Sequence, residues 1–207
     1  MSRRNLTDLV APGHTALVTQ ECQGAVVGPD AGLAVLADEA RREALPNIGK
    51  LLPVARTAGV RVVHCLVRRR ADGLGSNHNA KLFDLGRRGV SITQGSSGAA
   101  LLPEFGPEPA DLVLSRSHGL GPMGGTDLDA VLRNLGVRTI VAVGVSLNVA
   151  IPNLVMDAVN AAYDVVLPRD AVAGVPRAFG DAMIEHSLSL LTTVTTTQDL
   201  LEAWHRA

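Results

Sequence analysis

Aromatic residues are scarce in this sequence, and its positive and negative charges nearly balance. Phe, Trp and Tyr make up 2% of the 207 residues, and the formal net charge is −1. Nucleic acids and anionic membranes attract basic surfaces, and single strands also need aromatic rings for stacking. No apolar run approaches the roughly 18 residues of a membrane-spanning helix. We therefore expect neither nucleic acid nor membrane as a partner.

Cysteine is nearly absent as well. Cys22 and Cys65 both lie in apolar surroundings and form no disulfide framework, which favours a reducing cytoplasm. We interpret Cys22 as a small, buried apolar residue whose side chain points away from that of Glu21. The sequence contains no internal repeat and no proline-rich linker. A chain of this length is then predicted to form one domain, residues 1–207.

Short aliphatic runs are abundant, and they alternate with longer segments of helical spacing. Runs of four to eight apolar, β-branched residues are typical of parallel strands covered on both faces. The pattern predicts an α/β fold: a three-layer, doubly wound sheet of about six mostly parallel strands with helices on both faces. The expected strands are His14–Gln20, Val60–Val67, Asp111–Ser115, Thr139–Gly144, Asp164–Pro168 and a weaker Thr192–Thr196.

Helices are expected between these strands. The first segment, Ala31–Gly59, contains Pro46, which can begin a second helix at its first position. The irregular stretch Arg68–Ala110 is too long for a plain connection, so it should carry a short helix, Asn79–Arg88, and part of a site. The other expected helices are Thr126–Leu135, Val149–Ala162, Pro176–Leu191 and Gln198–Arg206.

Ligands of doubly wound sheets bind beyond the carboxyl ends of the strands, where the strand order reverses. Glu21 follows the first strand, and Arg116 and His118 follow the third. Glu21 is either an ordinary loop carboxylate or a working one. Arg116 could form a structural salt bridge, a substrate clamp, or both. His118 is either a solvated loop histidine or a residue that lines the site.

The fourth strand runs into a helix through the segment Gly144–Asn153. Asn148 is a natural N-cap, and Pro152 is tolerated in a first helical turn. Backbone N–H groups at such a junction can bind an anion or an oxyanion. The same pattern also fits a plain helix cap.

Taken in order, these segments resemble the isochorismatase-like cysteine hydrolase superfamily over about residues 13–200. The most specific part is Thr126–Ser146, which resembles the family's Gly-Thr-x-Leu helix, Leu-x-x-x-Gly turn and Thr-Gly-Val strand end. Met156–Ala158, Tyr163–Val166 and Asp170–Ala171 resemble the helix and strand that follow.

The resemblance implies a catalytic Asp, Lys and Cys, and all three positions differ here. They hold Glu21, Arg116 and Ala150, so no thiol nucleophile stands at the start of the fourth-strand helix. The Asp-x-His zinc pattern of one family branch is also missing after the second strand, so we expect no metal and no cofactor. The resemblance also implies a cis peptide bond, which would be Val145–Ser146 here.

Loss of the cysteine does not by itself imply inactivity. True isochorismatases also lack it and use the strand-one carboxylic acid, so the resemblance implies a hydrolase acting on a small, anionic molecule. Glu21 would be the acid/base, Arg116 the clamp, and the Ser146 and Ala150 N–H groups the oxyanion donors. Burial would favour the protonated form of Glu21, whereas Arg116 would favour the carboxylate. The main alternative is a non-catalytic family member that binds a small molecule or a partner, and a non-hydrolytic activity such as a lyase or isomerase step is a third.

Three further expectations concern the surroundings of this site. Arg68, or one of the two arginines after it, is predicted to bind a substrate carboxylate. Asn77 and His78, after a glycine-rich approach, are predicted to line the mouth. The aromatic-poor helices are compatible with self-association, and the family resemblance implies a homo-oligomer.

Overall fold

The protein is an α/β sandwich, seen in a computed structural model that describes residues 5–85 and 90–206. Its centre is a parallel seven-stranded sheet with the order β3-β2-β1-β4-β5-β7, and β6 pairs with β4 beside this path. The predicted fold class is confirmed. The strands are β1 (Thr15–Gln20), β2 (Arg61–Val67), β3 (Leu112–Arg116), β4 (Thr139–Val145), β5 (Asp164–Pro168), β6 (Val172–Ala173) and β7 (Thr193–Thr195).

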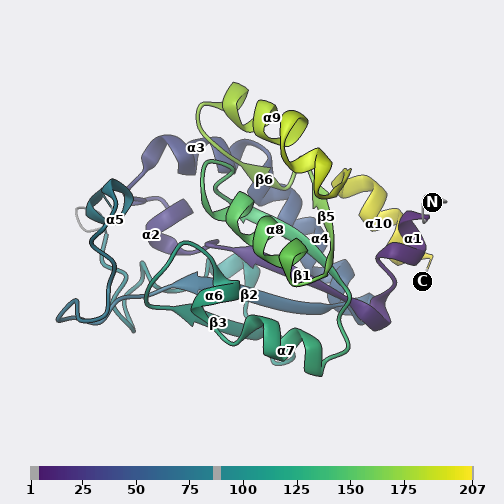
Figure 1. Cartoon of the computed structure of the whole chain (residues 1–207), viewed down its shortest axis with the longest axis horizontal. Helices are drawn as coiled ribbons and strands as arrows, with labels where there is room; N and C mark the ends of the chain where they lie inside the picture. The colour runs from purple at the N-terminus through teal and green to yellow at the C-terminus, as the bar shows by residue number, and fades with distance from the viewer. Residues whose placement is uncertain (1–4, 86–89, 207) are drawn as a thin grey trace.

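Helices cover both faces of the sheet (Figure 1). Among those described, α4 and α10 contribute to the core on one face, and α7, α8 and α9 to the core on the other. None of the described helices is long and apolar enough to span a bilayer. The α-helices are α1 (Leu6–Leu9), α2 (Gly24–Val27), α3 (Ala34–Arg42), α4 (Ala44–Ala58), α5 (Lys81–Leu85), α6 (Pro122–Gly125), α7 (Leu128–Asn134), α8 (Ala150–Asn160), α9 (Arg177–His186) and α10 (Thr197–His205), with 3-10 turns η1 (Pro12–His14), η2 (Pro103–Phe105) and η3 (Leu188–Leu190).

The strand order reverses between β1 and β4, which run side by side from Thr15 paired with Thr139 to Gln20 paired with Gly144. Gly144 has a φ of 112°, and a Cβ placed there would lie 2.3 Å from the carbonyl oxygen of Gln20. Only glycine permits this close approach of the two strands. The segments that follow β1 and β4 therefore leave the sheet together, as ligand sites in this topology require.

Several local expectations differ from the structure. β6 is too short, at two residues, to give a pattern in the sequence. Pro46 is the third residue of α4 rather than the first. Proline is tolerated there because the N–H groups of the first helical turn have no hydrogen-bond partner within the helix. Of the expected Asn79–Arg88 helix, α5 occupies Lys81–Leu85, and residues 86–89 lie outside the described part.

A chain of polar side chains crosses the buried middle of the sheet. The hydroxyl of Thr19 lies 2.8 Å from Nδ1 of His64, and Nε2 of His64 lies 3.3 Å from Oδ2 of Asp111. Arg56 completes the chain with a 2.7 Å ion pair to the same Oδ2 atom. His64 is fully buried, and burial lowers its pKa below the ordinary value of 6.5, although Asp111 opposes the shift.

This lowered pKa predicts a loss of stability in mild acid. Below about pH 6.5 the unfolded chain binds a proton at His64 that the folded chain refuses, so the free energy of unfolding falls as the pH drops. The loss is at most about 1.4 kcal/mol per pH unit and ends at the folded pKa. Urea unfolding at pH 7.5 and 5.5 should show a smaller decrease for His64→Gln than for the wild type. The exposed His205→Gln should behave as wild type; an equal decrease in all three proteins would contradict the assignment.

Candidate functional site

Glu21 and Arg116 form a partly buried ion pair at the carboxyl ends of the strands. Glu21 directly follows β1 with a φ of 54°, and its N–H donates to the carbonyl of Cys65 at 2.9 Å. Arg116 ends β3, is 5% exposed, and donates from Nη2 to Oε1 of Glu21. Its Nε donates to the carbonyl of Gly119 at 3.3 Å. The pair thus joins the ends of two strands that are separated by β2.

The turn that carries Glu21 is held by the amide of Gln23. Its Nε2 donates to the carbonyls of Val67 at 2.9 Å and Gly98 at 3.0 Å, and its Oε1 accepts from the N–H of Val67 at 2.7 Å. Gln23 is completely buried. Its three bonds tie the end of β1 to the end of β2 and to a loop far along the chain, so the carboxylate is positioned by rigid surroundings.

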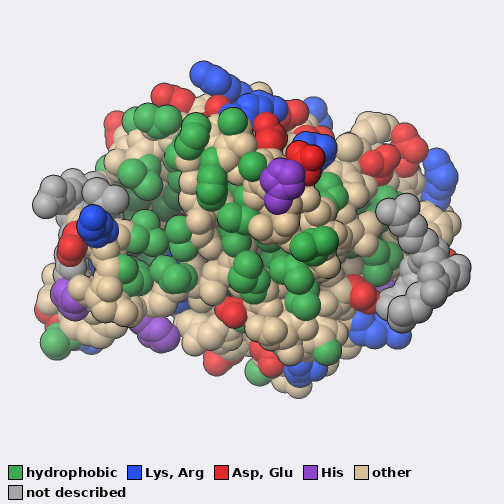
Figure 2. All heavy atoms as spheres, turned by 45° about the horizontal axis from the view of Figure 1, so that its top comes forward, with side chains coloured by type: hydrophobic (Ala, Val, Ile, Leu, Met, Phe, Trp, Pro, Cys, Tyr) green, Lys and Arg blue, Asp and Glu red, His purple; other side chains and the backbone are tan. Residues whose placement is uncertain are grey.

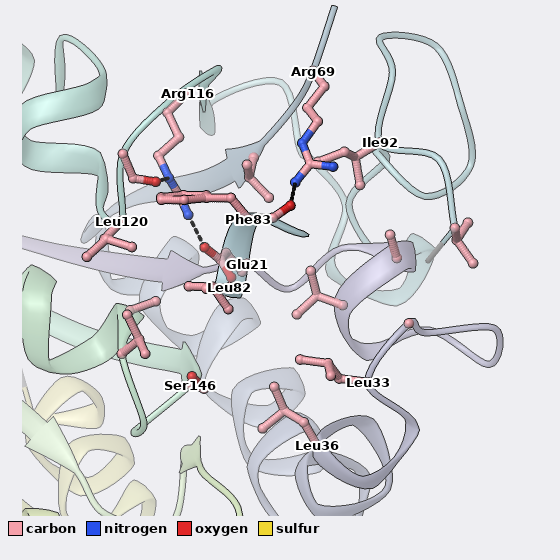
Figure 3. A pocket seen from close by; sticks show the side chains of 18 residues that line it. Glu21, Leu33, Leu36, Arg69, Leu82, Phe83, Ile92, Arg116, Leu120 and Ser146 are labelled. Atoms are coloured by element: carbon pink, nitrogen blue, oxygen red, sulfur yellow. Dashed lines mark hydrogen bonds and ion pairs between the residues drawn. The ribbon is translucent and has the colours of Figure 1, made fainter. Parts of the chain in front are cut away.

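The ion pair lines a cavity of about 160 Å³, which we call the Glu21 cavity. Ser146 and Ala150, from the junction of β4 and α8, line the same cavity, as does Arg69. Figure 3 shows Arg116 directed at Glu21, with Ser146 on the opposite side of the space. The structure therefore brings together Glu21, Arg116, Ser146 and Ala150, as the sequence predicted. Nη1 of Arg116 is buried and has no hydrogen-bond partner among the described residues.

The junction between β4 and α8 leaves backbone donors beside the cavity. The bond between Val145 and Ser146 is cis, as the family resemblance implied. The carbonyl of Ser146 accepts from Val149 and Ile151, whereas the described hydrogen bonds of the junction use neither the N–H of Ser146 nor that of Ala150. These two N–H groups belong to residues that line the cavity, so they are the donors available to a ligand there.

The predicted N-cap at Asn148 is wrong. α8 begins one residue later than that assignment requires, with Val149 as the N-cap residue and no side-chain cap. The amide of Asn148 instead pairs with the backbone of Val175, accepting from its N–H at 2.9 Å and donating to its carbonyl at 2.6 Å. The side chain therefore secures the segment after β6, a contact that local sequence does not reveal.

Four predicted substrate-binding residues do not line the Glu21 cavity. Arg68 borders a second, more polar cavity, which Arg69 and Arg116 also line. Of the three consecutive arginines, Arg69 is the one that lines the Glu21 cavity, because side chains alternate along an extended segment. His78 borders another cavity with Leu74, and His118 is exposed in the loop after β3.

Asn77 also stays outside the cavity, but it supports the loop that Arg116 contacts. Its Oδ1 accepts from the N–H of Gly119 at 2.7 Å, and the carbonyl of Gly119 accepts from Arg116. Asn77 is therefore placed to position Arg116 rather than to contact a ligand.

Sequence reasoning missed most of the cavity lining, which is apolar. Six large apolar side chains form what we call the apolar wall: Leu33, Leu36, Leu82, Phe83, Ile92 and Leu120. They come from the start of α3, from α5, and from two loops, and Figure 3 shows them around the space in front of the ion pair. Isolated leucines in helices and loops have the same sequence pattern as core residues, so no sequence signal identifies them as cavity residues.

The native thiols stand apart from this chemistry. Cys22 and Cys65 are both fully buried, as expected. Burial, with the nearby charges of Glu21 and Glu104, raises the pKa of Cys22 far above its usual range. Burial raises the pKa of Cys65 to about 12 despite the opposing charge of Arg116. In the described ranges, no group of three or more His, Cys, Asp and Glu side chains is arranged to hold a metal ion.

Solved structures share this fold. A cysteine hydrolase from Pseudomonas syringae pv. phaseolicola 1448A superposes with a TM-score of 0.85 at 23% identity, covering 100% of this chain and 99% of that one. An isochorismatase family protein from Desulfovibrio vulgaris gives a TM-score of 0.79 at 26% identity, covering 93% of this chain and 98% of that one.

Sequence comparison identifies the family. The sequence model of the isochorismatase domain matches residues 15–199, and the chain belongs to that family. The ureidoacrylate amidohydrolase RutB of Agrobacterium fabrum is 28% identical over 174 residues, which cover 77% of this chain and 76% of the relative. The same-named protein of Rhizobium rhizogenes is equally similar, with 77% and 70% covered.

A cysteine introduced at Ala150 should be unusually reactive. The thiol of Ala150→Cys would lie at the start of α8 in the cavity that Arg116 lines, where a helix N-terminus and a cation lower a thiol pKa. Iodoacetamide should alkylate it faster than Cys22 or Cys65 in the wild type, and faster than an exposed control thiol at Ser189→Cys. Alkylation no faster than the Ser189→Cys control would mean that the cavity is not electropositive. Amide hydrolysis should not be restored, because Arg116 stays protonated and cannot transfer protons.

Proposed function

We propose that this protein is a hydrolase that acts on a small, anionic molecule without a covalent cysteine nucleophile, with Glu21 as the acid/base. The observation that supports it most is the Glu21–Arg116 pair at the floor of an open cavity that Ser146 and Ala150 also line. A purely structural ion pair would not need a cavity of about 160 Å³ in front of it. The relatives with similar sequences are named amidohydrolases, which is consistent with hydrolysis.

In the proposed reaction, water replaces the missing thiol. As a carboxylate, Glu21 accepts a proton from water while the oxygen attacks the electrophilic carbon of the substrate; the protonated Glu21 then returns that proton to the leaving group. As an acid, Glu21 instead protonates the substrate first; water attacks the resulting cation and returns a proton to Glu21, and the bond to the leaving group then breaks. Both routes end with water divided between the two products and Glu21 restored.

The remaining groups would stabilise negative charge. The N–H groups of Ser146 and Ala150 would donate to the oxygen that becomes negative during attack, a role worth about 3–4 kcal/mol per donor in working enzymes. Arg116 would hold Glu21 in place and offer its unpartnered Nη1 to the substrate. Arg69, whose Nη2 donates to the carbonyl of Phe83 at 3.4 Å, adds a second cation at the cavity.

The alternative is a non-catalytic protein that binds a small molecule. It is favoured by one observation: Arg116 already pairs with Glu21, so the two charges compensate each other without a substrate. If the protein is a hydrolase, replacing the carboxyl group of Glu21 should abolish turnover. If it is a non-catalytic protein, the same replacement should change only binding.

A substrate screen with Glu21→Gln tests the proposal. The panel contains isochorismate, amides, ureido acids and enol ethers, and the products are followed by mass spectrometry. For any substrate turned over, Glu21→Gln should reduce kcat by about 10²–10⁴-fold, the usual contribution of a general acid or base. Glu104→Gln, which removes an exposed carboxylate elsewhere, should retain wild-type kcat. Turnover that survives in Glu21→Gln would refute the assigned role, and binding without turnover would favour the alternative.

We also expect the protein to assemble as a homo-oligomer. The family resemblance supports this, and exposed apolar residues such as Met156, Phe179 and Leu190 offer surface for contacts. Light scattering at micromolar concentration should give a mass that is a multiple of 21.6 kDa. A monomeric mass would contradict the expectation.

A further inference from the structure

The space in front of the ion pair is enclosed mainly by hydrocarbon. Apart from Glu21, Arg69, Arg116, Ser146 and two glycines, every residue that lines the cavity is apolar. Within the pair, the carboxylate and the guanidinium compensate each other, and Arg69 is a further cation among the residues that line the cavity. A polar group placed against this hydrocarbon would lose its hydrogen bonds to water without gaining others.

Three of the six residues of the apolar wall are unusually exposed for leucines, whereas Leu36 and Ile92 are buried. Leu33, Leu82 and Leu120 are 47%, 39% and 38% exposed, and all three border this one cavity. They lie on separate segments: the residue before α3, α5, and the loop after β3. On the face shown in Figure 2, hydrophobic side chains gather around a recess at the end of the molecule that carries α2, α3 and α5 in Figure 1. Apolar side chains that converge from distant segments and remain partly exposed mark a binding site rather than a core.

We propose that the substrate carries an apolar body, with a saturated chain or ring of about six carbons that packs against the apolar wall. Its reacting group then lies at Glu21, and its charged group reaches Arg69 or Arg116. This inference rests on the proposed function, because it takes the Glu21 cavity as the substrate site. The volume sets an upper limit on the size, because a cavity of about 150 Å³ accepts a benzene-sized ligand and this one measures about 160 Å³. The reacting and charged groups border the same space, so the apolar body has at most about six carbons.

Straight-chain alcohols test the apolar wall separately from the chemistry. They carry no charge and no bond that Glu21 can hydrolyse, so their binding does not depend on the proposed reaction. Titration calorimetry with ethanol, butanol, hexanol and octanol should show affinity that rises about fourfold per methylene, as expected for burial of hydrocarbon. The increase should level off after about six carbons, when the cavity is filled.

Matched variants locate the binding. Leu33→Asn with Leu82→Asn replaces two partly exposed side chains of the apolar wall, so folding should be preserved, and hexanol affinity should fall at least tenfold. Val35→Asn and Leu190→Asn are the controls, since these residues are 72% and 81% exposed and lie outside the cavity. Both controls should bind hexanol as the wild type does. Circular dichroism of each variant confirms that it is folded.

The outcomes separate this inference from the proposed function. Affinity independent of chain length, or an equal loss in wall and control variants, would overturn the apolar body. If alcohol affinity rises with chain length but turnover does not require Glu21, the apolar wall remains the binding surface and the acid/base role of Glu21 is rejected. Hexanoate tests the charged group of the substrate, and it should bind more tightly than hexanol. If this difference in affinity disappears at high salt, it reflects only a nonspecific attraction to surface cations.

Discussion

Two opposite charges, those of Glu21 and Arg116, meet at the floor of the cavity. Arg116 ends an edge strand and Glu21 ends a central one, so their contact fixes how the loops after β1 and β3 leave the sheet. Removing one partner from a buried pair typically costs about 3–5 kcal/mol, because the remaining charge is left uncompensated. The rest of the site, including the carbonyl of Gly119 and the amide of Asn77, is arranged around the guanidinium.

The ion pair and the apolar wall enclose the same space. Glu21, Arg116 and Arg69 supply its charges, and hydrocarbon forms most of the remaining lining. A ligand that fills the cavity excludes water and strengthens every electrostatic interaction inside it. An apolar substrate body would therefore change the electrostatics of Glu21 on binding, which connects specificity with reactivity in one site.

Local pattern was sufficient for the strands and insufficient for the polar contacts. β1, β2, β4 and β5 were located because each is a short, β-branched run buried on both faces, a pattern that few other structures share. Asn148 was misassigned because its amide finds a backbone partner 27 residues away at Val175, which a local cap rule cannot include.

The chemical identity of the site was determined by the sequence: a carboxylate after the first strand, a guanidinium after the third, and alanine at the start of the helix after the fourth. Parallel strand topology then requires these positions to meet, since the carboxyl ends lie at one edge of the sheet. Only the tertiary structure decided that the pair closes in front of a cavity, and which leucines surround that cavity. An apolar side chain shows the same local pattern whether it packs into a core or borders a site, and its role depends on segments as distant as Leu33, Phe83 and Leu120 coming together.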